Sequence, residues 1–356
     1  MGLTAAFWRG RRVLLTGHTG FKGAWLALWL ERLGARLTGF ALEADGDPNL
    51  FRLLAPWPRL DSIIGDVRDA DAVARAVERA DPEIAFHMAA QSLVRRGYRE
   101  PVATLATNVL GTANLLEALR AREGLRAVVV VTSDKCYDDS RGGPYGEDDR
   151  LGGRDPYSAS KACQEITAHS WRQSFYDAGG AALATARAGN VVGGGDWAED
   201  RLLPDVFRAL AAGAPVRLRR PDATRPWQHV LEPLSGYLIL AETLAEGGAE
   251  AAPPALNFGP DPAAVRPVAE VVERVLARWG GAPPWEKAGD PGPDETLELA
   301  LDARLAGETL GWRPRLTLDE TLDWTVEWHR DHAAGEAARR LTLAQIERYE
   351  ARLARP

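Results

Sequence analysis

The sequence predicts an α/β fold in which helices cover both faces of an open parallel sheet, a doubly wound arrangement. Up to about residue 189, short apolar runs alternate with longer amphipathic stretches, which is the pattern of βαβ units. Three glycines follow the first run and open the first amphipathic stretch. The chain of 356 residues is 46% hydrophobic and 26% charged, enough for a large core with a second lobe packed on it.

The individual elements follow from these runs in chain order. We expect strands at residues 12–16, 36–42, 62–64, 84–88, 127–132 and 182–187. Helices are expected at residues 22–33, 70–78, 102–122 and 156–177. Carboxylates precede prolines between them, as suits turns and first helical positions, at Asp81-Pro82, Glu100-Pro101 and Asp155-Pro156.

Beyond residue 189 the pattern loosens into Gly- and Pro-rich loops with shorter elements. We therefore predict a first domain over residues 1–189 and a smaller C-terminal lobe, mainly over residues 190–356. An apolar stretch around Leu256 suggests a strand that rejoins the sheet, so parts of 228–260 are assigned to the first domain. The tail over residues 334–356 has the pattern of a charged amphipathic helix.

The motif TGHTGFKG at residues 16–23 predicts a dinucleotide site. Gly17, Gly20 and Gly23 follow a predicted strand and open a predicted helix. Such glycines let the backbone turn tightly and approach a pyrophosphate, whose charge is favoured at the helix N-terminus. The first domain is therefore interpreted as a Rossmann-type NAD-binding domain.

Two acidic positions fit the adenosine half of such a cofactor. Glu43 stands twenty residues after Gly23, where a carboxylate holds the ribose hydroxyls, although exposed glutamates are common. No arginine closely follows the second strand to receive a 2′-phosphate, which favours NAD over NADP. Asp66 and Val67 follow the third strand, where they line the adenine pocket or form an acidic turn; both interpretations are open.

A second motif, YSASK, predicts an acid–base pair. Tyr157 and Lys161 share one face of a helix if Asp155 caps it and Pro156 begins it. An ammonium there lowers the pKa of the phenol, so that a tyrosinate removes an alcohol proton while hydride leaves for a nicotinamide. The hydroxyl of Ser133, at the end of another predicted strand, suits the same alcohol oxygen.

These segments carry a family resemblance. TGHTGFKG, VTSDKCY, YSASK, RAGNVVGGGDW and RPWQHVLEPLSGYL resemble the extended short-chain dehydrogenase/reductase family of nucleotide-sugar enzymes over nearly the whole chain. The similarity is greatest to its CDP-glucose 4,6-dehydratase branch. The resemblance implies that Phe21 and Ala89, together with Tyr157 and Lys161, contact NAD. It also implies a homodimer or homotetramer, paired through the helices at 102–122 and 156–177.

The resemblance further implies a reaction without net redox change. Tyr157 takes the proton of the sugar C4 hydroxyl as hydride passes to NAD, giving a 4-ketone that acidifies C5. Loss of the C5 proton and of the C6 hydroxyl as water follows, and the hydride returns to C6. The product is CDP-4-dehydro-6-deoxyglucose, a precursor of deoxy sugars in surface polysaccharides.

The pair that follows Ser133 departs from the dTDP-glucose branch of the family. That branch has an aspartate and a glutamate here, the glutamate being the expected C5 base, whereas this chain has Asp134 and Lys135. Asp134 fits the acid for the C6 hydroxyl if its surroundings keep it protonated. Lys135 is open to three roles: a neutral C5 base, a charged group that stabilises the enolate, or a partner of Asp134.

By the same resemblance, Asn190 and Arg225 contact the substrate diphosphate, for which an arginine fork is suited. Arg217 and Arg219 alternate along PVRLRR, where each either reaches the nucleotide or lies at a solvated strand edge. The assignment of cytosine as the base depends on the resemblance alone.

Composition excludes several other classes. A net charge of −7 gives no expectation of nucleic-acid or anionic-membrane binding, and no apolar run approaches a membrane span of about 20 residues. Cys136 and Cys163, the two cysteines, predict no disulfide framework and no metal site, and suit a cytoplasmic protein. Two alternatives to a CDP-glucose dehydratase stay open. One is another nucleotide-sugar 4,6-dehydratase or a 4-epimerase of the same family, and the other is a dinucleotide-binding regulatory protein without catalysis.

Overall fold

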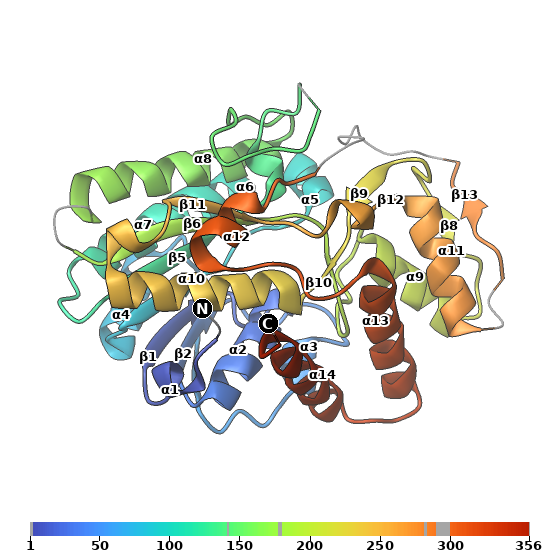
Figure 1. Cartoon of the computed structure of the whole chain (residues 1–356), viewed down its shortest axis with the longest axis horizontal. Coiled ribbons are helices and arrows are strands. Elements are labelled where there is room, and N and C mark those ends of the chain that lie inside the picture. The colour runs from blue at the N-terminus through green and yellow to red at the C-terminus, as the bar shows by residue number, and fades with distance from the viewer. Residues whose placement is uncertain (1–2, 141, 177–179, 281–282, 290–299, 356) are drawn as a thin grey trace.

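A seven-stranded sheet flanked by helices occupies the left half of the structure in Figure 1. The structure is a computed structural model that describes residues 3–140, 142–176, 180–280, 283–289 and 300–355. The strands are β1 (Arg12–Thr16), β2 (Arg36–Ala41), β3 (Leu60–Ile64), β4 (Ile84–His87), β5 (Ala127–Val131), β6 (Ala182–Ala188) and β11 (Ala255–Phe258). Their spatial order is β11-β6-β5-β4-β1-β2-β3, with every neighbouring pair parallel. The fold-class prediction is confirmed, including the late strand that joins the sheet.

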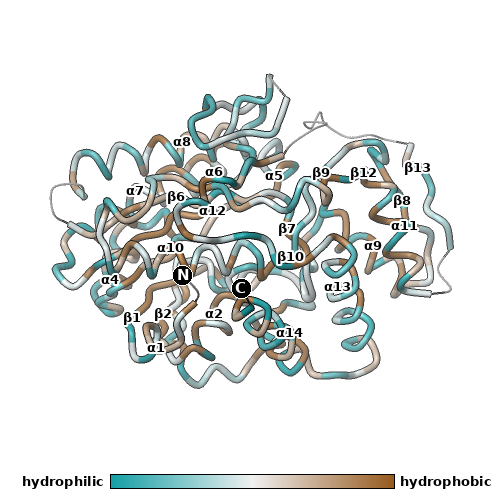
Figure 2. The backbone as a smooth tube through the Cα atoms, in the orientation of Figure 1, coloured by the Kyte–Doolittle hydropathy of each residue, from teal (hydrophilic) through white to brown (hydrophobic). Residues whose placement is uncertain are grey.

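Helices cover both faces, and the strands alternate their side chains between them. Val13 and Leu15 of β1 pack with α1 (Ala5–Trp8), α2 (Phe21–Leu33) and α10 (Leu231–Gly247). Leu14, between them, packs on the opposite face with α4 (Ala70–Ala80) and α7 (Gly111–Arg120). The same alternation recurs along β5. Colouring by hydropathy shows hydrophobic residues along the sheet and α2 and hydrophilic ones along surface loops (Figure 2).

The chain order reverses between β1 and β4, which are neighbours in the sheet although two strands separate them in sequence. In open α/β sheets, ligands bind beyond the carboxyl ends of the strands at this switch point. The ends of β1, β4 and β5, and the loops that follow them, are therefore where a site is expected.

The helix predicted at 102–122 is a helical run with an irregular centre. It consists of α6 (Pro101–Leu105), a π turn (Ala106–Leu110) and α7, and the short helix α5 (Val94–Arg99) precedes it. The expectation that no run approaches a membrane span is corrected here, because residues 101–120 reach that length with a mean hydropathy of 1.2. Thr104, Asn108 and Thr112 are nevertheless buried and hydrogen-bonded inside the protein, while 39% of the segment as a whole is buried.

The helix predicted at 156–177 is α8 (Pro156–Trp171), which continues as a π turn (Arg172–Tyr176); residue 177 lies outside the described residues. Asp155 caps α8 by accepting hydrogen bonds from the backbone N–H groups of Tyr157 and Ser158, at 2.9 and 3.0 Å. The cap fixes the first turn, on which Tyr157 lies. The carboxylate-then-proline signal therefore positions the YSASK motif as predicted.

The region beyond residue 189 contains two helices longer than the short elements expected there, α10 and α13 (Leu318–Ala333). The predicted tail helix is present as α14 (Ala338–Leu353), within the predicted range. The remaining elements of this region are β7 (Val191–Val192), α9 (Leu202–Ala211), β8 (Arg217–Leu218), β9 (Thr224–Pro226), β10 (Gln228–His229), β12 (Val265–Pro267), α11 (Val268–Trp279), β13 (Glu286–Lys287), α12 (Arg304–Leu310) and 3-10 turns at Ala249–Ala251 and Pro262–Ala264. The first domain also contains the short helix α3 (Leu50–Leu53) and a 3-10 turn at Asp134–Cys136. Helices α9, α11 and α13 enclose a separate apolar core, to the right of the sheet in Figure 1.

Candidate active site

The glycine motif forms a tight turn whose backbone cannot accommodate side chains. Gly17 follows β1 with φ +78°, and a Cβ there would lie 2.7 Å from the Ala89 nitrogen. A Cβ on Gly23 would lie 2.0 Å from the Gly17 carbonyl oxygen. Helix α2 begins at Phe21, and no side chain caps it at Gly20. The turn therefore leaves a backbone cradle at a helix N-terminus, which fits the pyrophosphate of a dinucleotide.

The other predicted cofactor positions border this turn. Ala89, after β4, donates its backbone N–H to Thr16 Oγ1 at 3.1 Å. Val67 is buried against Gly111, where a Cβ would lie 2.7 Å from Val67 Cγ2. Asp66 is paired with Arg68, whose hydrogen bonds lower the pKa of the Asp66 carboxyl. Glu43 is exposed and follows β2.

Ser133, Asp134 and Lys135 lie at the end of β5, in the 3-10 turn that follows it. The Ser133 hydroxyl donates to Asp134 Oδ1 at 2.9 Å and accepts the Lys135 backbone N–H at 3.2 Å. Asp134 is buried, whereas Lys135 is partly exposed. The turn therefore points a hydroxyl and a carboxyl into the protein at one place.

Burial raises the pKa of Asp134 above its usual value, and the charge of Lys135 and the Ser133 hydrogen bond only partly oppose this. Its second oxygen, Oδ2, is buried and has no hydrogen-bond partner among the described residues. A neutral carboxyl at this position has a proton to donate, which is the property that acid catalysis needs.

Tyr157 and Lys161 lie on one face of α8 and are both buried. Burial raises the pKa of Tyr157 to about 12, and a hydrogen bond with Ser133 opposes the rise. Burial also lowers the pKa of Lys161 to about 8. The pKa of Tyr157 is thus raised and not lowered as the sequence predicted, because burial is the largest effect and the groups that oppose it are Ser133 and Arg201.

The residues predicted to hold the substrate diphosphate lie close to Asp134. A Cβ on Gly189 would lie 2.9 Å from both Asp134 Oδ2 and Pro226 Cγ, so the loop containing Asn190 and the strand containing Arg225 meet at this carboxyl. Arg225 is buried in β9, and its charge lowers the pKa of Asp134. The backbone carbonyl of Asn190 accepts the Gln228 backbone N–H at 3.1 Å.

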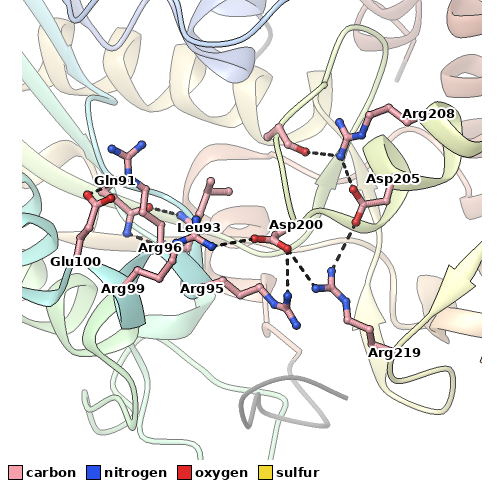
Figure 3. Close-up of polar contacts among 11 residues, drawn as sticks. Gln91, Leu93, Arg95, Arg96, Arg99, Glu100, Asp200, Asp205, Arg208 and Arg219 are labelled. Atoms are coloured by element: carbon pink, nitrogen blue, oxygen red, sulfur yellow. Dashed lines mark hydrogen bonds and ion pairs between the residues drawn. The ribbon is translucent and has the colours of Figure 1, made fainter. Parts of the chain in front are cut away.

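Arg217, in β8, and Arg219, directly after it, point their side chains in different directions. Arg217 is exposed, and its nearest ion-pair contact is Glu286 at 4.0 Å. Arg219 lies 3.2 Å from Asp200 and 3.5 Å from Asp205. Figure 3 shows Asp200 between Arg219 and the arginines of α5. The structure thus brings Arg219, and not Arg217, toward the first domain.

Asp200 links α5 to the C-terminal part of the chain. It lies 3.2 Å from Arg95 and 3.6 Å from Arg99. Helix α5 in turn packs on α8, since a Cβ on Gly97 would lie 3.2 Å from Tyr157 Cβ. This contact places a cluster of guanidinium groups next to the helix that carries Tyr157.

Three residues at the site were not assigned a role from the sequence. Lys22 donates to the Tyr237 hydroxyl at 3.0 Å, and burial, with the charges of Arg201 and Lys161, lowers its pKa to about 7. Arg201 donates to Ser92 Oγ at 3.1 Å and counteracts the raised pKa of Tyr157. The position of Lys22 inside the glycine motif could have indicated a role at the site. Tyr237 lies on a long hydrophobic helix, where the sequence gives no such indication.

The described residues contain no group of three or more His, Cys, Asp or Glu side chains placed to hold a metal ion. The site's chemistry is therefore built from a backbone cradle, two hydroxyls, a buried carboxyl and several cationic side chains.

Comparison with known proteins places these features in a family. The model of the NAD dependent epimerase/dehydratase family matches residues 13–257. A CDP-glucose 4,6-dehydratase of Salmonella typhimurium is 46% identical over 336 residues, which cover 93% of each chain. A UDP-glucose 4-epimerase of Mycolicibacterium smegmatis is 28% identical, over 90% of this chain and 99% of that one.

A solved structure agrees with this placement. The dTDP-glucose 4,6-dehydratase DesIV of Streptomyces venezuelae, solved with NAD and TYD bound, has a TM-score of 0.77 at 25% identity. The match covers 91% of this chain and 98% of that one. From its sheet topology, its glycine cradle and these likenesses, the chain belongs to the NAD dependent epimerase/dehydratase family.

Proposed function

We propose that the protein is a hydro-lyase that converts CDP-glucose to CDP-4-dehydro-6-deoxyglucose and water, with NAD as a cofactor that is regenerated in each turnover. The observation that carries the proposal is Asp134: a buried carboxyl whose pKa is raised, directly after Ser133 and with Oδ2 unpartnered among the described residues. The 46% identity to a CDP-glucose 4,6-dehydratase supports this substrate and reaction.

The first step is removal of the C4 hydroxyl proton by Tyr157. Ser133 lies close enough to Tyr157 to lower the pKa of the phenol, so the two hydroxyls are placed to share one substrate oxygen and align the alcohol for oxidation. NAD, held at the glycine turn, would supply the acceptor for the C4 hydride and its return to C6. Lys161 supplies a positive charge one helical turn from Tyr157 on α8.

The second step is elimination of water across C5 and C6. The 4-ketone acidifies the C5 hydrogen, which leaves as a proton, and Asp134 protonates the C6 hydroxyl as it departs. Lys135, which follows Asp134 in the turn, is kept in two alternative roles. In its neutral form it accepts the C5 proton; in its protonated form it joins Lys22 in counteracting negative charge on the ketone oxygen.

The diphosphate is assigned to Asn190, Arg225 and Arg219. Arg225 is buried next to Asp134, and Arg219 is directed toward the first domain. Arg217, which the sequence offered together with Arg219 for the nucleotide, is left out because its side chain is exposed and lies 4.0 Å from Glu286. The NAD-binding domain at 1–189 and the substrate lobe at 190–356 then meet around the substrate, with α10 and β11 returning to the sheet.

A 4-epimerase is the second candidate, favoured by the 28% identity to such an enzyme over nearly the whole chain. Epimerisation at C4 needs Tyr157 and the nicotinamide but releases no water, so it gives no role to a neutral Asp134 beside them. The dehydratase is therefore preferred, as it also is over a non-catalytic dinucleotide-binding protein, in which Tyr157 and Lys161 have no task.

We further propose a homodimer, which works in the cytoplasm, formed through an apolar face defined by Tyr98, Val102, Leu105, Leu110, Ile166 and Phe175. Their exposures range from 40% for Leu105 to 79% for Val102. They belong to α5, α6, α8 and the π turns, and α6 packs against α8. Contiguous exposed apolar residues of this kind mark protein contacts.

The proposed reaction is tested with CDP-, dTDP-, GDP- and UDP-glucose in the presence of NAD. A 4-keto product absorbs in alkali, and its mass is lower by one water. Turnover with CDP-glucose in strong preference to the others supports the proposal. Dehydration of another sugar nucleotide overturns the cytosine assignment, and C4 inversion without water loss favours the epimerase.

A further inference from the structure

A chain of five buried polar side chains, named here the polar chain, runs from the glycine turn to α8. Its members are Thr16, His87, Thr112, Gln164 and Lys161, all at most 2% exposed. The successive distances are 2.8 Å from Thr16 Oγ1 to His87 Nδ1, 2.9 Å from His87 Nε2 to Thr112 Oγ1, 2.8 Å from Gln164 Nε2 to Thr112 Oγ1, and 2.8 Å from Lys161 Nζ to Gln164 Oε1.

The direction of every hydrogen bond in the polar chain is determined. Thr112 donates its proton to the Asn108 carbonyl at 2.7 Å, so Thr112 Oγ1 accepts from both His87 and Gln164. His87 is consequently protonated on Nε2 and accepts the Thr16 hydroxyl on Nδ1. This agrees with its burial, which lowers the pKa of His87 to about 3 and keeps the ring neutral.

The amide of Gln164 therefore has one orientation. Its nitrogen donates to Thr112, which leaves its oxygen to accept from the ammonium of Lys161. The other oxygen near that ammonium is the Val131 carbonyl, at a longer 3.4 Å. Gln164 thus supplies the shorter of the two contacts, and a flipped amide would lose both of its bonds.

We infer that Gln164 is a positioning residue whose side-chain oxygen holds the Lys161 ammonium at the site. The side-chain nitrogen of Gln164 links Gln164 in turn, through Thr112 and His87, to the end of β1. The inference rests on the proposed role of Lys161 in the oxidation step. Because Thr16 also accepts the backbone N–H groups of Met88 and Ala89, at 3.1 Å each, the polar chain connects the base of the cofactor cradle to the catalytic lysine.

The charged and titratable groups around Lys161 come from several elements. Glu165 on α8 favours its protonated form. Cys136 is a neutral thiol, because burial raises its pKa well above the usual value, and His87 is neutral as above. Lys22 on α2 is the neighbouring cation, and burial lowers the pKa of Lys161 itself to about 8. An acceptor for the ammonium therefore decides how much of Lys161 stays charged above neutral pH.

Two substitutions of Gln164 should shift the pKa of Lys161 in opposite directions. Gln164→Met keeps the length and removes the acceptor, so the pKa of Lys161 should fall by about 1 pH unit. Gln164→Glu replaces the neutral acceptor by a carboxylate, so it should rise by a similar amount. Gln345→Met is the matched control, because Gln345 is also a buried amide but donates to the Trp324 carbonyl, at 2.7 Å, in another part of the chain.

The pKa is measured directly in the NAD-loaded protein by 13C NMR of labelled lysine. The chain has only four lysines, Lys22, Lys135, Lys161 and Lys287, and Lys161→Arg assigns the resonance. In parallel, the alkaline limb of the pH profile of kcat/KM for CDP-glucose should move to lower pH in Gln164→Met and to higher pH in Gln164→Glu. Shifts of the Lys161 pKa in opposite directions in the two variants support the inference, because a structural defect alone would not lower the pKa in one variant and raise it in the other.

An unchanged Lys161 pKa in both folded variants, or movement in the same direction, overturns the inference. If Gln164→Met does not fold, Gln164→Glu alone decides it by the presence or absence of the upward movement. Absence of CDP-glucose turnover in the unmodified protein counts against the proposed function, while the NMR titration still decides the role of Gln164.

Discussion

At the residue scale, the protonation state of Asp134 separates the two halves of the proposed reaction. We expect Asp134→Asn to retain oxidation at C4 and to lose the acid for water departure. The dehydration rate should fall by about 10²- to 10⁴-fold, the usual contribution of a general acid. Rapid mixing with CDP-glucose should then show reduced cofactor accumulating on the enzyme instead of returning its hydride.

Glu242→Gln is the matched control for this substitution. Burial also raises the pKa of Glu242, to about 7, but this carboxylate accepts hydrogen bonds from Trp8 and Thr4 far along α10. Its replacement should leave dehydration nearly unchanged. An Asp134→Asn enzyme that dehydrates CDP-glucose at the normal rate would exclude Asp134 as the acid.

The sequence predicted the residues of this site better than their electrostatics. Ser133 and Asp134 were identified because polar residues directly after an apolar strand lie at the carboxyl edge of a parallel sheet. The pKa of Tyr157 could not be predicted, because it depends on burial by residues distant in sequence. The sequence could not decide between Arg217 and Arg219, because the direction of alternate side chains at a short strand is set by tertiary packing.

At the element scale, the turn from β1 into α2 depends on the absence of side chains. A methyl group at Gly23 would lie 2.0 Å from the Gly17 carbonyl oxygen, so Gly23→Ala must displace the turn. We expect a loss of about 1–3 kcal/mol in the free energy of unfolding. NAD affinity, measured by calorimetry, should fall by at least about tenfold, equivalent to roughly 1.4 kcal/mol.

Gly289→Ala is the comparison, because nothing lies within 4 Å of a Cβ at that position. It should leave both the unfolding free energy and NAD affinity unchanged. If Gly23→Ala bound NAD as tightly as the unmodified protein, the cradle would not be the pyrophosphate site.

A second element-scale prediction concerns the contact between α10 and α14. Glu232 on α10 accepts hydrogen bonds from the Tyr349 hydroxyl and from the backbone N–H groups of Arg315 and Leu316, and burial raises its pKa to about 7. Between pH 4.5, the ordinary pKa of a glutamate, and about pH 7, the folded protein therefore keeps Glu232 protonated, whereas the unfolded chain releases the proton. The stability contributed by the neutral carboxyl is lost as the pH rises through that window.

Glu232→Gln removes this titration. The unfolding free energy of the unmodified protein, relative to that of Glu232→Gln, should decrease by about 3 kcal/mol between pH 4.5 and 7. Urea unfolding at a series of pH values measures the difference. Glu347→Gln, an exposed carboxylate on α14, should show a much smaller trend, and parallel curves for Glu232→Gln would refute the prediction.

Strands and helices with a clear alternation of hydrophobic and polar residues were predictable from the sequence, and those without such a pattern were not. The alternating runs of the first domain gave the strands within a few residues, because each strand is bounded by turns. Helix α10 was missed because fourteen of its seventeen residues are buried, so no polar face marks its period. The π turn at 106–110 was also missed, since no propensity rule identifies a single additional residue in a helical turn.

At the scale of the whole molecule, the apolar face predicts how two copies associate. A charge at Val102 or Ile166, which are 79% and 56% exposed, should be tolerated in a monomer and disfavoured inside a dimer contact. We expect Val102→Glu with Ile166→Glu to shift the mass measured by light scattering from dimer to monomer. Leu42→Glu, at an equally exposed position outside this face, should not; an unchanged dimer in the double variant would exclude the face.

In the proposed reaction the hydride that leaves C4 returns to C6 of the same sugar as water leaves, so bound NAD would be unchanged after each turnover. The most direct test uses CDP-glucose deuterated at C4, with the product's mass and the position of its label determined by mass spectrometry and NMR. The proposal predicts loss of one water with the deuterium retained at C6. A product of unchanged mass with C4 inverted, or a dehydrated product without the label at C6, would contradict it.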